Sequence, residues 1–287
     1  MCADRVRFGI LGGTFDPVHL GHIASASEIA RAFALTRVLL VLSARPPHKT
    51  AGEAAPAADR WQMLELAAAK ANASSPDVIF EPCDIEMRRD APSWTVDTLK
   101  EIAGRHPHSD LFLILGADAY AEIDSWSRPG EIPALANIIV TTRPGWPVAA
   151  GTDASRDANA DVSGIAGADA SRDARADVPV SAADRRGHVH DEASPPLPPV
   201  AAREDARYDP AIGVYVHTSG HTIHGHRIRG IEVSSSEIRS RVRRGLPVEH
   251  LTGDAVARYI HQHRLYADGG TPTPAGSAKS SQGAGKD

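Results

Sequence analysis

The sequence lacks several features that would place it in a specialised class of protein. Its 287 residues include only two cysteines, Cys2 and Cys83, which form no CxxC pair, so a disulfide framework is excluded and a reducing compartment is indicated. No apolar run approaches the roughly 20 residues that a membrane-spanning helix needs. Residues 1–7 contain no apolar segment of the signal-peptide type. We therefore expect a cytoplasmic protein with no membrane partner.

Excess charge of one sign is confined to a single segment. The formal net charge is −5, and residues 145–206 alone hold 11 acidic and six basic side chains. The rest of the chain is close to neutral, without the strongly basic surface that binds nucleic acids. The composition therefore disfavours DNA or RNA as a partner.

The same segment is also poor in residues that build a core. Apart from Trp146 it has no aromatic residue, and it repeats the pattern GTDASRDANADV at 151–162 as GADASRDARADV at 167–178. Such a composition buries too little apolar surface to offset the entropy lost on ordering. We expect 145–206 to be a low-complexity, flexible insertion, with a weak helix through the repeat as the alternative. The tail, 268–287, is similar in composition and is expected to be disordered.

The remaining ranges, 1–144 and 207–267, alternate short apolar strands with amphipathic helices and are of a size for a single domain. The expected strands are 6–11, 37–42, 111–115, 137–142 and 213–217. The expected helices are 20–34, one capped by Asp59, one capped by Ser93 or Thr95, one from Ser234 to Gly245, and one from Asp254 to His263. This order predicts an α/β fold, a Rossmann-like, doubly wound parallel sheet with helices on both faces. Ligands of such sheets bind beyond the carboxyl ends of the strands.

The loop between the first strand and the first helix reads GGTFDPVHLGH. Gly12 and Gly13 allow close approach of a ligand to the backbone, and the helix start offers free N–H groups to an anion. His19 and His22 are one helical turn apart and can point at one phosphate chain. The spacing fits neither a P-loop nor a dinucleotide fingerprint. The alternative is that both histidines are ordinary surface or capping residues.

A second segment, VSSSEIR at 233–239, places serines and an arginine at another helix start. The two segments resemble the HxGH and ISSTxxR motifs of the nucleotidylyltransferase superfamily, with Val for Ile and Ser for Thr. The resemblance implies transfer of a nucleotide monophosphate from ATP or CTP. It implies catalytic roles for His19, His22 and Arg239, and an ATP site formed by Gly12, Gly13, Thr14, Phe15, Ser234, Ser235 and Ser236.

Other segments resemble one branch of that superfamily, the nicotinate-nucleotide adenylyltransferases: PPHK at 46–49, Arg60, PSWT at 92–95, GAD at 116–118, Trp126 and RPG at 143–145. This resemblance implies ATP with Mg²⁺, and nicotinate mononucleotide, as substrates. The substrate-binding residues that it implies are His48, Lys49, Trp94, Thr95, Gly116, Asp118, Trp126 and Arg143. In that branch the N–H groups at Trp94 and Thr95 would take the pyridine carboxylate, and Trp126 would stack on the ring.

Two alternatives of function stay open at this point. The acceptor could be nicotinamide mononucleotide or pantetheine phosphate, and the chain could be a catalytically silent nucleotide-binding module. A group of histidines could ligate a transition metal: His217, His221, His224 and His226, together with His188 and His190 in the insertion. They have no neighbouring cysteine, and the glycines among them indicate a mobile hairpin, so we assign no metal site. The sequence is compatible with a homo-oligomer.

Overall fold

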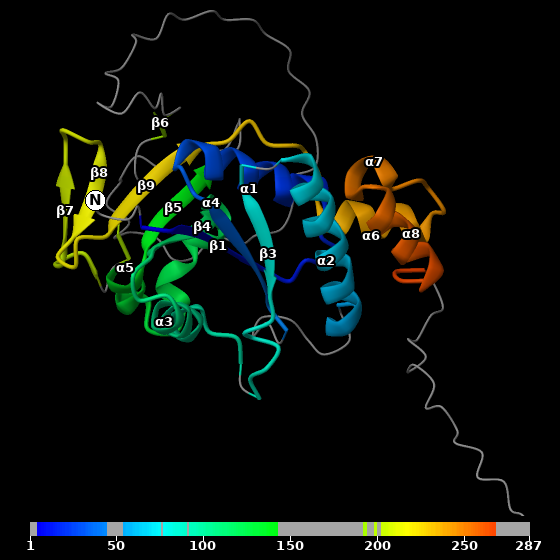
Figure 1. The fold of residues 1–287 in the computed structure, drawn as a ribbon, viewed down its shortest axis with the longest axis horizontal. Helices are drawn as coiled ribbons and strands as arrows, with labels where there is room; N and C mark the ends of the chain where they lie inside the picture. Colours follow the sequence, from blue (N-terminus) through cyan, green and yellow to red (C-terminus); the bar gives the residue numbers. More distant parts are fainter. Residues whose placement is uncertain are drawn as a thin grey trace, which may run out of the picture. The chain divides into compact units, whose positions relative to one another are not determined.

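The computed structural model describes residues 5–44, 54–75, 77–90, 92–142, 192–193, 198–199 and 202–267 (Figure 1). The chain divides into two compact units, Met1–Ile114 with Arg229–Asp287, and Leu115–Ile228. The boundary between the units, at residue 114, falls inside an apolar strand rather than in a linker.

The sheet of the first unit contains parallel strands in the order β3-β2-β1-β4. Their bounds are Arg7–Gly13 (β1), Arg37–Leu42 (β2), Ile79–Cys83 (β3) and Asp110–Gly116 (β4), the last two residues of β4 belonging to the second unit. The chain runs from β1 outward to β2 and β3 and then returns to β4 on the other side of β1. The strand order therefore reverses beside β1, which is where doubly wound sheets bind ligands.

Helices surround this sheet in the first unit. Their bounds are Leu20–Ala32 (α1), Ala57–Ser74 (α2), Thr95–Arg105 (α3), Ser235–Arg243 (α6), Glu249–Thr252 (α7) and Asp254–Gln262 (α8). α8 packs against α2, and α7 packs against α1. A small apolar core of Val233, Ile238, Val248 and Ala257 holds the carboxyl-terminal helices together. The start of α6 is thereby fixed within the same unit as the start of α1.

The second unit mixes parallel and antiparallel pairing. Its strands are Asn137–Thr142 (β5), Glu192–Ala193 (β6), Ala206–Asp209 (β7), Val214–His217 (β8) and Thr222–Arg227 (β9). β5 runs parallel to β9, whereas β6 and β8 are antiparallel to β9, and β7 is antiparallel to β8. The short helices are Ala117–Ala121 (α4) and Ile132–Leu135 (α5), with 3₁₀ turns at Ile123–Ser125 and Pro129–Glu131.

The predicted elements are present, and the strands 37–42 and 137–142 match residue for residue. Two helix caps were predicted wrongly. α2 begins at Ala57 after Pro56, so Asp59 lies inside its first turn, and the N-cap of α3 is Trp94 rather than Ser93 or Thr95. Both regions contain residues whose side chains can cap a helix, but neither helix start has a side-chain cap. The cap at Ser234 is confirmed, because its Oγ accepts the N–H of Glu237 at 3.1 Å.

β3 and β9 were not predicted. β3 reads IFEPC and leaves Ile79 exposed at the end of the strand order, while β9 reads TIHGHR and carries two histidines and a glycine. Neither is an apolar run or a clean alternation, so periodicity gave no signal. The predicted mobile hairpin at 217–226 is instead the β8–β9 pair.

The expected flexible insertion contains some ordered backbone. β6 lies within 145–206, Ala202 is 1% exposed, and the carbonyl of Asp205 accepts the N–H of Thr218 at 2.7 Å. The low average hydrophobicity of 145–206 gave no signal for these few ordered residues. The two near-repeats and the tail 268–287 lie outside the described residues. No helix in the described part of the chain is long and apolar enough to cross a membrane.

Candidate active site

The loop after β1 turns sharply and buries its aromatic residue. Phe15 has a left-handed backbone (φ 46°), and its side chain is only 2% exposed. Its ring lies edge-on to the ring of His22, with 5.1 Å between the ring centres. Phe15 was expected to bind ATP. Its side chain instead packs against His22, so that only its backbone can contact a ligand.

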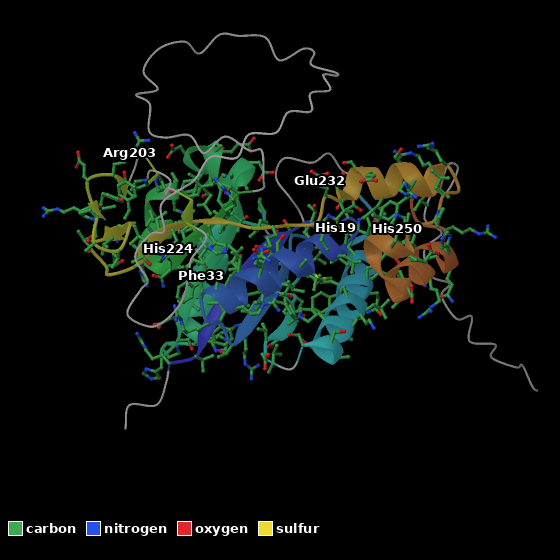
Figure 2. All side chains as sticks on the ribbon, turned by 90° about the horizontal axis from the view of Figure 1, so that it is seen from above. His19, Phe33, Arg203, His224, Glu232 and His250 are labelled. Carbon is green, nitrogen blue, oxygen red and sulfur yellow. The ribbon has the colours of Figure 1, made fainter. Side chains whose placement is uncertain are left out.

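His19, labelled in Figure 2, is the N-cap of α1, and His22 lies one turn further along at the start of the same helix. Their rings are stacked, with centres 3.6 Å apart and planes 24° apart. The backbone N–H of His19 donates to Nδ1 of His22 at 3.2 Å. A nitrogen that accepts a hydrogen bond carries no proton, so the neutral His22 ring carries its proton on Nε2. His22 therefore has an N–H donor on the ring edge opposite to the backbone bond.

Gly21 is required by the close approach of the two sequence motifs. A Cβ at this position would lie 2.8 Å from Cγ1 of Val233 and 3.0 Å from Nδ1 of His19. Val233 directly precedes the cap of α6, so the missing side chain lets the first turn of α1 pack against the second motif. The HxGH spacing thus includes a packing requirement as well as two histidines.

The serines at the start of α6 have three different partners. Ser234 caps the helix, Ser235 Oγ donates to the carbonyl of Pro17 at 3.0 Å, and Ser236 Oγ accepts Nη2 of Arg239 at 3.2 Å. The bond to Pro17 ties the second motif to the first. The helix start that was expected to bind phosphate therefore lies next to the loop that follows β1.

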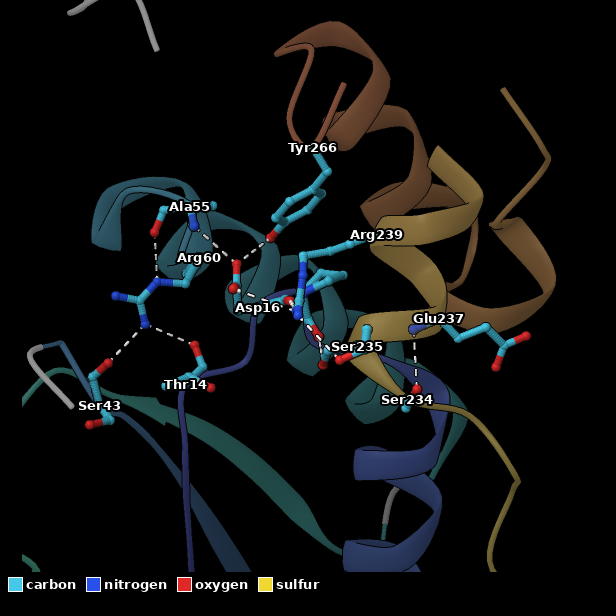
Figure 3. Close-up of polar contacts among 12 residues, drawn as sticks. Thr14, Asp16, Ser43, Ala55, Arg60, Ser234, Ser235, Glu237, Arg239 and Tyr266 are labelled. Carbon is cyan, nitrogen blue, oxygen red and sulfur yellow. Dashed lines mark hydrogen bonds and ion pairs between the residues drawn. The ribbon is translucent and has the colours of Figure 1, made fainter. Parts of the chain in front are cut away.

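Arg239 reaches across to that same loop (Figure 3). Its Nη1 donates to the carbonyl oxygen of Asp16 at 2.6 Å and lies 3.6 Å from Oδ2 of Asp16. The side chain is 23% exposed. A guanidinium has five N–H groups, so Arg239 keeps donors for an anion while it is held by Asp16 and Ser236.

Arg60 organises the neighbouring loops and was not placed in the site from the sequence. It is 3% exposed and donates to the carbonyl oxygens of Thr14, Ser43, Ala44 and Ala55, at 2.8–3.2 Å. Burial lowers the pKa of Arg60 below its ordinary value, while Asp16 and Tyr266 oppose the shift. The ordinary pKa of an arginine lies far above neutral pH, so the group stays charged. Arg60 therefore fixes the ends of the loops after β1 and β2.

Asp16 and Tyr266 are two further residues that the sequence reading missed. Asp16 is 1% exposed, and its Oδ1 accepts the Ala55 N–H at 3.1 Å and the Tyr266 hydroxyl at 2.8 Å. Asp16 lies within the GGTFDPVHLGH loop, which was a usable signal. Tyr266 is 250 positions away, and no motif pointed to it.

The expected nicotinate-binding residues Trp94 and Thr95 form the start of α3 in the first unit. No side chain caps this helix start. Ser93 Oγ is buried and has no hydrogen-bond partner among the residues that the structure describes. Within α3, Thr98 donates to Glu86 at 2.8 Å and accepts Nη1 of Arg89 at 3.0 Å, which anchors the first turn.

The other expected substrate-binding residues lie in the second unit or outside the described ranges. Gly116 is the N-cap of α4, and a Cβ there would overlap Oδ1 of Asp118. Trp126 follows the first 3₁₀ turn and is partly buried. His48, Lys49 and Arg143 lie outside the described residues.

The histidines of the β8–β9 hairpin make local contacts. Ser219 Oγ lies 2.8 Å from Nδ1 of His217 and 2.9 Å from Nδ1 of His221. Thr222 Oγ1 lies 2.7 Å from Nε2 of His224 on β9; His224 is labelled in Figure 2. Within the described ranges, no group of three or more His, Cys, Asp or Glu side chains could hold a metal ion. His188 and His190 fall outside those ranges.

Comparison with known proteins places this arrangement in a family. The family model for cytidylyltransferase-like proteins matches residues 10–241. A protein of Geobacter sp. (strain M21), named probable nicotinate-nucleotide adenylyltransferase, is 31% identical over 263 residues, covering 92% of this chain and 99% of the relative. A protein of the same name from Thermus thermophilus is 42% identical over 143 residues, covering 50% of this chain and 73% of the relative.

Solved structures agree in fold. The Plasmodium falciparum nicotinic acid mononucleotide adenylyltransferase complexed with NaAD superposes with a TM-score of 0.55 at 15% identity, over 91% of this chain and 98% of that chain. At this identity the similarity concerns the fold alone, and it confirms the predicted Rossmann-like sheet. The family model and the near full-length relative, by contrast, match this chain in its amino-acid sequence. The chain therefore belongs to the cytidylyltransferase-like family and, within it, to the nicotinate-nucleotide adenylyltransferases, a branch of the nucleotidyltransferases.

Proposed function

We propose that this protein transfers AMP from ATP to nicotinate mononucleotide, forming nicotinate adenine dinucleotide and pyrophosphate in NAD biosynthesis. The observation that carries the proposal is the meeting of the two motifs. Arg239 of the second motif donates to the carbonyl of Asp16 in the first, beside the stacked pair His19 and His22. Donors from both motifs thus surround one site beyond β1, where a triphosphate would be held.

The reaction needs positioning and charge stabilisation rather than a protein nucleophile. A phosphate oxygen of nicotinate mononucleotide attacks the α-phosphorus of ATP, a new P–O bond forms, and the bond to the β-phosphate breaks. The attacking phosphate is already an anion, so no general base is needed. His22 donates its Nε2–H to charge that develops on the α-phosphoryl oxygens. Arg239 and the Ser235–Ser236 helix start hold the departing pyrophosphate.

The nucleotide substrate would be ATP with Mg²⁺ bound, which would neutralise charge on the triphosphate. Asp16, the carboxylate of the loop, does not suit the role of a metal ligand, because it is 1% exposed and binds Ala55 and Tyr266. We therefore expect phosphate oxygens and water to supply most of the coordination. Chelation by EDTA is expected to abolish turnover, and added Mg²⁺ is expected to restore it.

We assign the selection of a carboxylate on the acceptor to the start of α3. Its uncapped N–H groups at Trp94 and Thr95, and the buried Ser93 Oγ, favour an anion over a neutral amide. Trp126 would stack on the pyridine ring, and Asp118 would accept ribose hydroxyls. We assign Gly116, His48, Lys49 and Arg143 to the acceptor as well, on the strength of the family motifs.

The test is pyrophosphate release from ATP and Mg²⁺ with nicotinate mononucleotide, nicotinamide mononucleotide or phosphopantetheine offered separately. We expect strong preference for the nicotinate substrate. Ser93→Ala is expected to raise KM for nicotinate mononucleotide and to leave KM for ATP unchanged. Preference for another acceptor would overturn the assignment at Trp94, Thr95 and Trp126, and no release with any acceptor would favour a silent nucleotide-binding module.

A further inference from the structure

A single tyrosine connects the carboxyl-terminal end of the described chain to the loop of the first motif. The hydroxyl of Tyr266 donates to Oδ1 of Asp16 at 2.8 Å (Figure 3). The same oxygen accepts the N–H of Ala55 at 3.1 Å. The other carboxylate oxygen, Oδ2, faces Nη1 of Arg239 at 3.6 Å. One buried carboxylate therefore links Tyr266 to the arginine of the second motif.

The backbone that delivers Tyr266 is held in an unfavourable conformation. After α8 ends at Gln262, both Arg264 and Tyr266 have left-handed backbones, with φ of 51° and 65°. Such residues are strained unless they are glycine, and they persist where surrounding contacts hold them. Here Leu265 is 8% exposed, and its N–H donates to the carbonyl of Ile260 at 3.0 Å. The strained turn thus has a specific result, which is to direct the Tyr266 hydroxyl at Asp16.

The hydroxyl determines how the carboxylate of Asp16 is oriented. Tyr266 and Ala55 both bind Oδ1, which fixes the rotation of the carboxylate and leaves Oδ2 toward Arg239. Arg239 is then held by the Asp16 carbonyl at 2.6 Å, while the longer contact to Oδ2 does not consume its other donors. Burial, followed by the charge of Asp16, raises the pKa of Tyr266 well above its ordinary value. Tyr266 is therefore a hydrogen-bond donor at any working pH.

We propose that Tyr266 is a positioning residue for the pyrophosphate end of ATP: its hydroxyl orients Asp16, so that Arg239 presents its remaining N–H groups to the phosphates. The turn that follows α8 is thereby part of the active site. The inference rests on the proposed function only for the identity of the ligand, a nucleoside triphosphate or pyrophosphate. Without the hydroxyl, the carboxylate can rotate and draw the guanidinium into a closer ion pair, away from the phosphates.

The chain offers a matched control for this bond. Tyr259 on α8 donates its hydroxyl to Oδ1 of Asp59 at 2.9 Å, which ties α8 to α2. This contact is also a tyrosine–aspartate bond between the carboxyl-terminal segment and the rest of the first unit. It touches neither motif. Tyr259→Phe therefore removes a hydrogen bond of the same kind and leaves the contacts of Arg239 intact.

The experiment compares Tyr266→Phe and Tyr259→Phe in the full chain. Calorimetry measures Kd for ATP with Mg²⁺ and for pyrophosphate, and steady-state kinetics measure KM for both substrates. We expect Tyr266→Phe to weaken ATP and pyrophosphate binding about five- to tenfold, the scale of one ordinary hydrogen bond, since the lost bond acts on the ligand only through Asp16 and Arg239. KM for nicotinate mononucleotide is expected to stay within about twofold. Tyr259→Phe is expected to leave all these constants unchanged.

A double-mutant cycle with Arg239→Ala completes the test. If Tyr266 acts through Arg239, Tyr266→Phe has no further effect on pyrophosphate binding once the arginine is gone. Equal effects of the two tyrosine variants, or a full additional loss in the Arg239→Ala background, would overturn the proposal in favour of general anchoring.

The binding measurements also separate the two proposals. Weaker ATP binding by Tyr266→Phe in a protein that shows no turnover with any acceptor would support the positioning role and refute the proposed function. A wild-type protein that binds neither ATP nor pyrophosphate would refute both.

Discussion

His22 shows how one backbone bond selects the chemistry of a side chain. Because its Nδ1 accepts the N–H of His19 at 3.2 Å, the neutral ring offers Nε2–H to a ligand. His22→Ala is expected to lower kcat by about 100-fold, the scale of removing one donor from a developing charge. Stability should fall by only about 1 kcal/mol, since one hydrogen bond is lost. Turnover assays and urea unfolding measure the two effects.

The control for this variant is His250→Ala on α7, where the histidine is exposed. It is expected to change neither quantity. Unchanged turnover in His22→Ala would contradict the role assigned to that ring.

Gly21 and Gly104 form a second comparison at the scale of one residue. Both are helical, but a Cβ at Gly21 would lie 2.8 Å from Val233, while a Cβ at Gly104 would meet nothing within 4 Å. Gly21→Ala is expected to destabilise the protein by about 1–3 kcal/mol and to weaken ATP binding, because overpacking displaces His19. Gly104→Ala should stabilise it by about 0.5–1 kcal/mol through the entropy of the unfolded chain. Thermal unfolding that shifts in the same direction for both variants would refute the packing argument.

At the scale of elements, the start of α2 joins the ends of two strands through Arg60. The guanidinium binds carbonyl oxygens that follow β1 and β2 and precede α2. Arg60→Met would leave these buried acceptors without their donor, so we expect a loss of at least about 3 kcal/mol in unfolding free energy. ATP affinity should fall as well, because Thr14 loses its anchor. Urea unfolding and calorimetry provide the measurements.

The matched control is Arg31→Met, which replaces an exposed arginine near the end of α1. Surface changes of this kind alter stability by about 0.5 kcal/mol or less. If Arg60→Met were equally mild, the buried contacts of Arg60 would not be what fixes the loops.

Elements also show where local sequence signals succeed and fail. The start of α6 was predictable because the Ser234 side chain accepts a backbone N–H from the first turn of the same helix. The starts of α2 and α3 were not, because Pro56 and Trp94 occupy the cap positions without a capping side chain. β3 and β9 escaped prediction since their pairing with β2 and β5 depends on distant residues. Pairing across the sheet can stabilise a strand whose own pattern is weak.

At the scale of the whole molecule, the long segment between β5 and β6 can be tested by deletion. Thr142 pairs with Arg227 on one side of β9, and Glu192 pairs with His226 on the other. Two strand spacings separate these ends by about 10 Å. If 148–190 are removed, residues 143–147 and 191 remain and can span roughly 20 Å. We therefore expect turnover within about twofold of wild type and little change in melting temperature.

A longer deletion, 148–205, is the contrasting variant. It also removes β6, the buried Ala202 and the Asp205 carbonyl that binds Thr218. This protein is expected to melt at a lower temperature. A folded 148–190 deletion that has lost turnover would show instead that the removed segment takes part in the reaction.

The sequence by itself determined the α/β class, the order of most strands and helices, and the family, because these follow from local periodicity and from short motifs such as GGTFDPVHLGH. It also supplied His19, His22 and Arg239. Tertiary structure alone decided how these residues are held: the close approach at Gly21, the loops fixed by Arg60, and the bond from Tyr266 to Asp16 across 250 positions. The physical reason is that a pattern along the chain reports the neighbours of a residue in sequence. A buried hydrogen bond between residues far apart in the sequence produces no such pattern, so only the folded structure reveals it.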